Sequence, residues 1–330
     1  MTQSEEAAAW RLFCWNWSLL GVMTATLLAA LALTRFSIEP TSALTPIAII
    51  GAYAGYAYYK FRNPLKRDPF VIFTLGSTGQ ILLIPAVMAP MTYIAASADL
   101  PMQDTVLNAL DRALHLDWVA YFNFVYDHHP LLTTAVWSYA LIGCPIFGVP
   151  VALGWTGRYW RLQVFTLAFA LALIVTTIVS IFVPAIGTYD VLNIHPDPNV
   201  FTPGGYLDQL HDLPLVRDGT LRELSYRSLT GLITFPSFHA ASAVLYLWAF
   251  WPVRWVGPAA AVVNIVMLLA TPVVGGHYFV DIFAGIAVAV GAIAAATSIA
   301  HWVAGRAAMP ALAGSRAGAP DEIAVTAVLD

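Results

Sequence analysis

The chain has 330 residues, of which 59% are hydrophobic and 10% are charged, and its formal net charge at pH 7 is −4. An ordinary soluble domain has about a quarter charged residues, so this composition excludes that class and favours one integral membrane domain. The basic residues form no patch of the kind that binds nucleic acids, so we expect no nucleic-acid partner.

Eight apolar blocks are each about as long as the roughly 20 residues that a helix needs to cross the hydrocarbon core of a bilayer. They are separated by runs that hold proline, glycine and nearly all of the charge. We therefore predict an all-α polytopic membrane protein with about eight transmembrane helices. The expected spans are residues 12–34, 41–59, 70–97, 131–154, 160–183, 235–251, 256–273 and 278–302.

The basic residues are divided unevenly between the two sides that these spans define. Ten of the fifteen lysines and arginines lie near the two termini and in the connections 60–69, 155–161 and 252–255. The positive-inside rule makes that side cytoplasmic. We therefore expect a multi-pass protein of the cell (inner) membrane with both termini in the cytoplasm.

Two segments on the opposite, non-cytoplasmic side are not spans. Residues 101–129 carry apolar residues at helical spacing with charged residues between them, which predicts an amphipathic interfacial helix that forms a lid or a shelf for substrate. Residues 184–233 form the longest loop, and a long loop ordered over one membrane face is usually functional. Residues 304–330 are biased to alanine, glycine and proline, and we expect a disordered cytoplasmic tail there.

The sixth expected span opens with the sequence TFPSFH at residues 234–239. Pro236 suits the first position of a helix, where its missing N–H costs nothing. The backbone N–H groups near Ser237, Phe238 and His239 would then be free at the amino terminus of the helix. Such a helix start favours an anion such as phosphate.

The eighth expected span opens with the sequence GGHYFVD at residues 275–281. His277 and Asp281 are four residues apart at the start of a helix, so their side chains share one face. The carboxylate can accept the proton of one imidazole nitrogen and leave the other nitrogen as a lone pair, which is the role of the acid in a catalytic triad. Gly276 and the glycine before it let a phosphate approach the free amides of the helix start.

The seventh span returns the chain to the same membrane face, so the two helix starts would form an anion cradle without a metal ion. The reaction that fits is in-line phosphoryl transfer, with His277 attacking phosphorus and His239 protonating the leaving oxygen. The alternative is that both are interfacial histidines that donate to loop carbonyls. The two histidines, the aspartate and the paired glycines together favour catalysis, and we expect neither a metal nor a cofactor.

Both segments resemble signatures of a known family. Pro236-Ser237-x-His239 and His277-x-x-x-Asp281 are similar to the second and third signatures of the type 2 phosphatidic acid phosphatase superfamily, and they look closest to its inositol phosphorylceramide synthase (inositolphosphotransferase) branch. The resemblance implies a six-helix catalytic core, here residues 70–303, that follows two amino-terminal transmembrane helices in residues 1–69. It also implies a phosphohistidine on His277, with Asp281 as its partner and His239 as acid and base.

The sequence departs from the superfamily pattern in its cations. The lysine and Arg-Pro of the first signature are missing from the loop before the sixth span. Thr271 stands where the third signature usually has an arginine, and a threonine at that spacing also resembles the synthase branch. The phosphate therefore needs positive charge from elsewhere.

The arginines of the 184–233 loop are the candidates, because a guanidinium group suits bidentate contact with phosphate. We favour Arg217, with a salt bridge to a carboxylate of the same loop as the alternative. The predicted phosphate-binding residues are Arg217, Arg222, Arg227, Ser237, Phe238 and Gly276.

The sequence thus predicts a lipid phosphatase or lipid phosphotransferase that acts at the non-cytoplasmic face. Its expected substrate is a phospholipid or an isoprenoid or sphingolipid phosphate in the surrounding membrane. Water as the acceptor gives a phosphatase, and a lipid or polyol hydroxyl gives a synthase. The alternatives are a membrane transporter and a non-catalytic scaffold that binds lipid phosphate.

Overall fold

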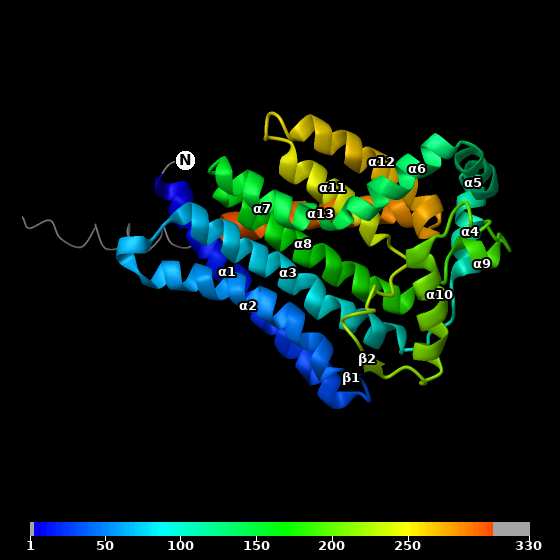
Figure 1. Cartoon of the computed structure of the whole chain (residues 1–330), viewed down its shortest axis with the longest axis horizontal. Helices are drawn as coiled ribbons and strands as arrows, with labels where there is room; N and C mark the ends of the chain where they lie inside the picture. The colour runs from blue at the N-terminus through cyan, green and yellow to red at the C-terminus, as the bar shows by residue number, and fades with distance from the viewer. Residues whose placement is uncertain (1–2, 306–330) are drawn as a thin grey trace, which may run out of the picture.

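The computed structural model describes residues 3–305, which fold into a bundle of helices (Figure 1). The longer helices are α1 Gln3–Leu33, α2 Pro40–Arg62, α3 Pro69–Ala96, α8 Tyr159–Phe182, α12 Gly257–Gly275 and α13 Phe279–Gly305. The shorter helices are α4 Asp104–Ala113, α5 Trp118–Asp127, α6 His129–Ala140, α7 Pro145–Trp155, α9 Thr188–Val191, α10 Gly204–Arg217 and α11 Phe238–Phe250. Two 3₁₀ turns, η1 Pro64–Lys66 and η2 Leu141–Gly143, and the two-residue strands β1 Ser37–Ile38 and β2 Glu223–Leu224 complete the regular structure of this part of the chain.

The prediction of an all-α polytopic membrane protein is confirmed. Within residues 3–305, α1, α3, α8, α12 and α13 are long and apolar enough to cross a membrane. α6 with η2 and α7 pass the same test only as a pair bent by 65°, which has the form of a broken span or a re-entrant loop. The other two expected spans correspond to α2 and to the 13-residue α11, which do not meet the same measure of length and hydropathy.

The central helix of the bundle is α8, which packs against α1, α3, α11 and α13. Side chains on all of its faces are apolar, and Leu162, Phe165 and Ala172 are fully buried. A helix that is apolar on every side can be surrounded by other helices, so the composition of this block accounts for its place in the core.

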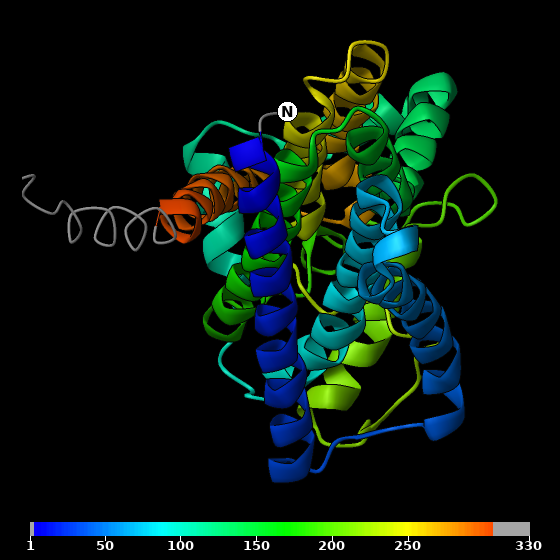
Figure 2. The ribbon, with the colours of Figure 1, turned by 90° about the vertical axis from the view of Figure 1, so that its left-hand side faces the viewer.

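Hydrogen bonds between buried polar side chains join α1 to the core. Asn16 of α1 donates to Oε1 of Gln163 on α8 over 3.2 Å, and Gln163 donates to Oγ of Ser77 on α3 over 2.8 Å. All three side chains are buried, where such bonds stabilise the association of membrane helices. In contrast, α2 packs mainly on α3 and lies to one side of the bundle (Figure 2).

A small parallel sheet connects the 184–233 loop with the α1–α2 connection. Ser37 of β1 pairs with Glu223 of β2. Close by, the Ser225 hydroxyl donates to Oε2 of Glu39 over 2.7 Å, and the Tyr226 hydroxyl donates to a backbone carbonyl of α3 over 2.7 Å. The long loop is therefore anchored to the amino-terminal helices as well as to the core.

The connections that the charge pattern assigned to opposite sides of the membrane lie at opposite ends of the bundle. Figure 1 shows α4, α5, α9 and α10 at one end and the amino terminus and the α2–α3 connection at the other. The loop 184–233 contains α9 and α10. The predicted tail, residues 304–330, lies outside the described residues from residue 306 onward.

The segment predicted as one amphipathic helix, residues 101–129, is helical but forms two helices, α4 and α5. The chain turns between them at His115, whose φ of 59° lies in the left-handed region and ends α4. Asp117 then starts α5, since its side chain accepts a hydrogen bond of 3.0 Å from the Ala120 amide.

Candidate active site

The segment between α12 and α13 holds His277 against Asp281. α12 ends at Gly275 and is capped by Gly276, whose φ of +66° is the left-handed conformation that favours glycine at a helix end. Nδ1 of His277 lies 3.2 Å from Oδ2 of Asp281, and the same oxygen accepts a 3.0 Å hydrogen bond from the Tyr278 amide. His277 is 5% exposed and Asp281 is fully buried. Because the carboxylate occupies Nδ1, Nε2 of His277 is the nitrogen that can attack a substrate.

The start of α11 is capped by Ser237 and leaves two amides free. The Ser237 side chain accepts a 3.3 Å hydrogen bond from the Ala240 amide, and α11 begins at Phe238. Pro236 therefore lies before the cap, and the prediction that it occupies the first helical position was wrong. The amides of Phe238 and His239 have no hydrogen-bond partner among the described residues, as expected for the first turn of a helix.

A backbone hydrogen bond joins the two predicted segments. The Ser237 amide donates to the carbonyl oxygen of Asp281 over 3.0 Å. The helices can approach this closely because Gly285 of α13 faces the start of α11, where a Cβ atom would lie 2.3 Å from the Ser237 carbonyl oxygen. The structure therefore brings His239 and His277, 38 positions apart in the sequence (277 − 239), to one end of the bundle.

The imidazole of His239 lies against Tyr139, a residue that the sequence did not single out. The two rings are stacked with their centroids 3.9 Å apart and their planes 9° from parallel. The Tyr139 hydroxyl oxygen lies 3.1 Å from Nδ1 of His239. In the sequence Tyr139 is one of fourteen tyrosines and sits in an expected span, so no local signal distinguishes it.

The paired glycines make room for side chains of the protein itself. A Cβ atom on Gly275 would lie 2.6 Å from the Tyr139 hydroxyl and 2.7 Å from Cδ2 of His277. A Cβ atom on Gly276 would lie 2.9 Å from the ring of Tyr206 and 3.1 Å from that of Tyr189. Phosphate contact by Gly276 stays a prediction, but the rings of Tyr206 and Tyr189 already fill the space beside its Cα where a Cβ would lie.

The start of α13 is occupied by a carboxylate that the sequence interpretation missed. Asp111 of α4 accepts hydrogen bonds of 2.8 and 2.9 Å from the amides of Phe279 and Val280. Burial raises the pKa of the Asp111 carboxyl above its ordinary value, and these two amides oppose that shift. Because a negatively charged side chain already sits on these amides, the start of α13 is closed to a phosphate.

Asp104, two turns before Asp111 on the same face of α4, has a similar role. Its carboxylate accepts hydrogen bonds from the amides of Ile186 and Gly187 and from the Tyr278 hydroxyl, at 3.0 to 3.1 Å. α4 thus joins the 184–233 loop to the segment that carries His277. The two aspartates are among the charged residues that lie between the apolar positions of the predicted interfacial helix, and both are buried.

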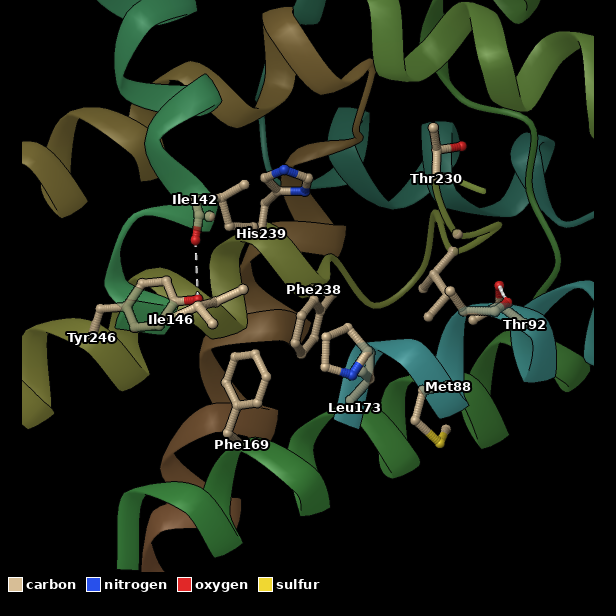
Figure 3. A pocket seen from close by; sticks show the side chains of 15 residues that line it. Met88, Thr92, Ile142, Ile146, Phe169, Leu173, Thr230, Phe238, His239 and Tyr246 are labelled. Atoms are coloured by element: carbon tan, nitrogen blue, oxygen red, sulfur yellow. Dashed lines mark hydrogen bonds between the residues drawn. The ribbon is translucent and has the colours of Figure 1, made fainter. Parts of the chain in front are cut away.

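An apolar cavity of about 260 Å³ opens beside His239 (Figure 3). Its walls come from α3, α8, α11, the broken span α6–α7 and residues 230–233. Phe238, Phe169 and Leu173 contribute much of its lining, and Thr92 and Thr230 contribute hydroxyl groups at one end. No lysine, arginine, aspartate or glutamate lines this cavity among the described residues.

The arginine favoured as a phosphate ligand has other partners. Arg217 ends α10, and its Nη2 lies 2.7 Å from Oδ1 of Asp99 and 2.9 Å from the Leu100 carbonyl oxygen. The alternative, a salt bridge to a carboxylate of the same loop, was wrong in its partner, because the acid is Asp99, which lies outside the 184–233 loop. Phosphate binding by Arg217 stays a prediction that requires its release from Asp99.

The other two arginines also have partners at the edge of the molecule. Arg222 donates to the carbonyl oxygen of Val216 over 2.8 Å and lies over the ring of Phe36. Arg227 is 70% exposed and lies 3.9 Å from Glu39. None of these contacts involves either histidine, so phosphate binding by Arg222 or Arg227 also stays a prediction.

The donor set of the site is poor in metal ligands. Across residues 3–305, no group of three or more histidine, cysteine, aspartate or glutamate side chains is arranged to hold a metal ion. Reaction without a metal remains a prediction that a chelator experiment can test.

Comparison with known proteins places both motifs within one family. A family model described as the PAP2 superfamily matches residues 105–295, more than half of the chain, and this range contains His239, His277 and Asp281. No curated protein and no solved structure gives a significant match.

Proposed function

The chain belongs to the PAP2 superfamily, and we propose that it is an integral membrane lipid phosphatase or phosphotransferase that works through a phosphohistidine on His277. The observation that carries this proposal is the hydrogen bond between Ser237 and Asp281, which holds two histidines and a free helix start at one end of a membrane bundle. The geometry supports His277 as the nucleophile because its Nδ1 faces a buried carboxylate.

In the first step, Nε2 of His277 attacks phosphorus, a nitrogen–phosphorus bond forms, and the bond from phosphorus to the leaving oxygen breaks. His239 donates a proton to that oxygen, so an alcohol is released. Asp281 accepts the Nδ1–H of His277 and stabilises the positive charge that the ring acquires. The free amides of Phe238 and His239 stabilise the phosphoryl oxygens.

In the second step, water or an alcohol gives its proton to His239 and attacks phosphorus. The nitrogen–phosphorus bond to His277 breaks, and the histidine is restored. Water yields a phosphatase reaction, and a lipid or polyol hydroxyl yields a transferase reaction. The two reaction classes therefore share one set of residues and differ in the acceptor alone.

The apolar cavity supports a lipid as the donor. It borders His239, the proposed acid, and not His277. The part of the substrate that enters it is therefore the hydrocarbon body of the leaving alcohol. A phospholipid, an isoprenoid phosphate and a sphingolipid phosphate all have such a body.

The scarcity of cations favours a phosphodiester donor over a phosphomonoester. Asp111 already occupies the start of α13, and the cavity beside His239 has no charged lining in the part of the chain that the structure describes. A helix start supplies only about half a positive charge, which suits the single charge of a diester better than the two charges of a monoester. A diester donor and an alcohol acceptor would place the chain with the inositol phosphorylceramide synthase branch.

The proposed orientation has both termini in the cytoplasm and the site on the opposite face. Single cysteines at Lys66 and Arg227 test it, in a background that lacks the exposed Cys14 and Cys144. A membrane-impermeant maleimide should label Arg227→Cys in intact cells and leave Lys66→Cys unlabelled until the cells are opened. The reverse pattern would put the site in the cytoplasm.

Turnover by the purified protein separates this proposal from a transporter or a lipid-phosphate scaffold, because neither of these needs His277 to react. Detergent-purified protein should hydrolyse or transfer the phosphoryl group of a phosphate ester or diester, and His277→Ala should abolish this activity. EDTA should have no effect, and vanadate should inhibit. Unchanged turnover in His277→Ala, or loss in EDTA that zinc restores, contradicts the mechanism.

A further inference from the structure

His239 and His277 are held in different ways. His277 faces a carboxylate, whereas the imidazole of His239 lies flat on the ring of Tyr139. In the described part of the chain, Tyr139 makes the one ring contact and the one hydrogen-bond-length contact of the His239 side chain. The orientation of the His239 ring therefore depends on Tyr139.

The parallel planes decide which part of Tyr139 restrains His239. A phenolic oxygen lies in the plane of its own ring, so the Tyr139 hydroxyl lies over the face of the imidazole, 3.1 Å from Nδ1. The lone pair or N–H of Nδ1 points along the imidazole plane, away from that oxygen, so the hydroxyl is poorly placed to select a tautomer. The restraint comes from the flat stacking of the two rings.

The broken span attaches Tyr139 firmly to α11. Tyr139 lies in the last turn of α6, directly before the 3₁₀ turn η2. Within η2, the carbonyl oxygen of Ile142 accepts a 3.1 Å hydrogen bond from the hydroxyl of Tyr246 (Figure 3). Tyr246 follows His239 by seven residues, about two helical turns, so the two contacts lie on one face of α11. The stacked pair is therefore part of a two-point attachment.

The stacked pair also reaches the nucleophile. The position that a Cβ atom of Gly275 would take lies 2.6 Å from the Tyr139 hydroxyl and 2.7 Å from the His277 ring. The Tyr139 hydroxyl and the His277 ring therefore both lie close to the same backbone position.

We propose that Tyr139 is a positioning residue, whose ring holds the plane of His239 so that an imidazole nitrogen points at the leaving oxygen. This inference rests on the proposed function, because it takes His239 as the proton donor. In the first step of the reaction, it predicts an effect on the proton transfer to the leaving group. An alkyl alcohol needs that proton in order to leave, whereas p-nitrophenolate leaves readily without it.

The test compares two esters with the same phosphoryl part, octyl phosphate and p-nitrophenyl phosphate, or the methyl diesters of both alcohols if the monoesters are not turned over. Tyr139→Leu should lower kcat/KM for the octyl ester by about tenfold or more and for the p-nitrophenyl ester by less than about threefold. We compare kcat/KM because it reports the steps up to release of the alcohol and excludes the return step that the two esters share. His239→Ala should show the same selectivity to a greater degree. Tyr139→Phe keeps the ring and should keep the ratio of the two rates. That ratio does not depend on how much of a preparation is folded.

Four outcomes would contradict the proposal or the function on which it rests. Equal losses on both esters in Tyr139→Leu would make Tyr139 merely structural. A change of the ratio in Tyr139→Phe as large as in Tyr139→Leu would make the hydroxyl the acting group. Turnover that survives His277→Ala would reject the proposed function itself. A larger loss on the octyl ester than on the p-nitrophenyl ester in His239→Ala, with no such difference in Tyr139→Leu, would reject only the positioning role of Tyr139.

Discussion

The two helices that carry the site begin in different ways. At the start of α11, Ser237 caps one amide and the amides of Phe238 and His239 stay free. At the start of α13, the first two amides donate to the carboxylate of Asp111. Both starts look alike in the sequence, since each follows a turn and lies beside a histidine.

The difference shows that a helix start can bind an anion only where its first amides have no hydrogen-bond acceptor within the protein. In α13 the protein supplies its own anion, which stabilises the segment that carries His277 and keeps a phosphate away from it. In α11 the amides remain for the substrate. We therefore infer that α11 binds the phosphoryl group and that α13 presents the nucleophile.

Removal of the nucleophile should have the largest effect. His277→Ala should lower kcat by at least about a thousandfold, because no other group at the start of α13 can form the covalent bond. Asp281→Asn should lower kcat by about a hundredfold, because a neutral amide orients the imidazole less well and does not stabilise its positive charge. Steady-state assays measure both, and a His277→Ala protein with a tenth of normal activity would refute the division between the helices.

Separation of the two helix starts should have the second-largest effect on kcat. Gly285→Ala places a Cβ against the Ser237 carbonyl and should push α11 away from α13, with a loss in kcat on the order of a hundredfold. Gly291→Ala on the same helix is the control, because no atom lies within 4 Å of its added Cβ. Equal activities of the two variants would mean that the spacing of the starts is unimportant.

Removal of the Asp111 carboxylate from the start of α13 should have a moderate effect on the stability of the protein. Asp111→Ala leaves the Phe279 and Val280 amides without a partner and should destabilise the protein by about 1–2 kcal/mol, as the loss of a helix cap does. Thermal unfolding in detergent measures this change. KM should not fall; a fall in KM would show that the freed amides bind phosphate, so the two helix starts would be equivalent.

The arginines should give the smallest effects. Arg217→Ala breaks a half-buried pair with Asp99 and should lower the melting temperature, with KM unchanged. Arg227→Ala, at an exposed position, should change neither quantity. A tenfold rise in KM in Arg217→Ala with an unchanged melting temperature would instead support the sequence-based prediction that Arg217 binds phosphate.

The features that the sequence predicted well are short-range. The apolar blocks predicted the membrane helices because burial in a bilayer depends on composition over about 20 residues. The spacing of four residues predicted the contact of His277 with Asp281, although His277 lies two residues before α13 and reaches the carboxylate from the turn and not from the helix.

The features that the sequence missed depend on distant partners. Val106, Leu110 and Leu114 belong to the apolar positions of the predicted interfacial helix, and about half of each is exposed. Asp104 and Asp111 are buried in their place because their partners are backbone amides at residues 186–187 and 279–280. Those amides meet α4 only in the folded bundle, so no local pattern could indicate the contact. The stacking of Tyr139 on His239, 100 positions away, is of the same kind.

Trapping of the covalent intermediate tests the central claim most directly. In His239→Ala, p-nitrophenyl phosphate can still phosphorylate His277, because its leaving group needs no proton, whereas the return step lacks its base and is slow. Peptide mass spectrometry after an alkaline quench should find one phosphoryl group on the peptide that contains His277, and none in the His239→Ala/His277→Ala double variant. Release of p-nitrophenol without an adduct, or an adduct on another residue, would contradict the account.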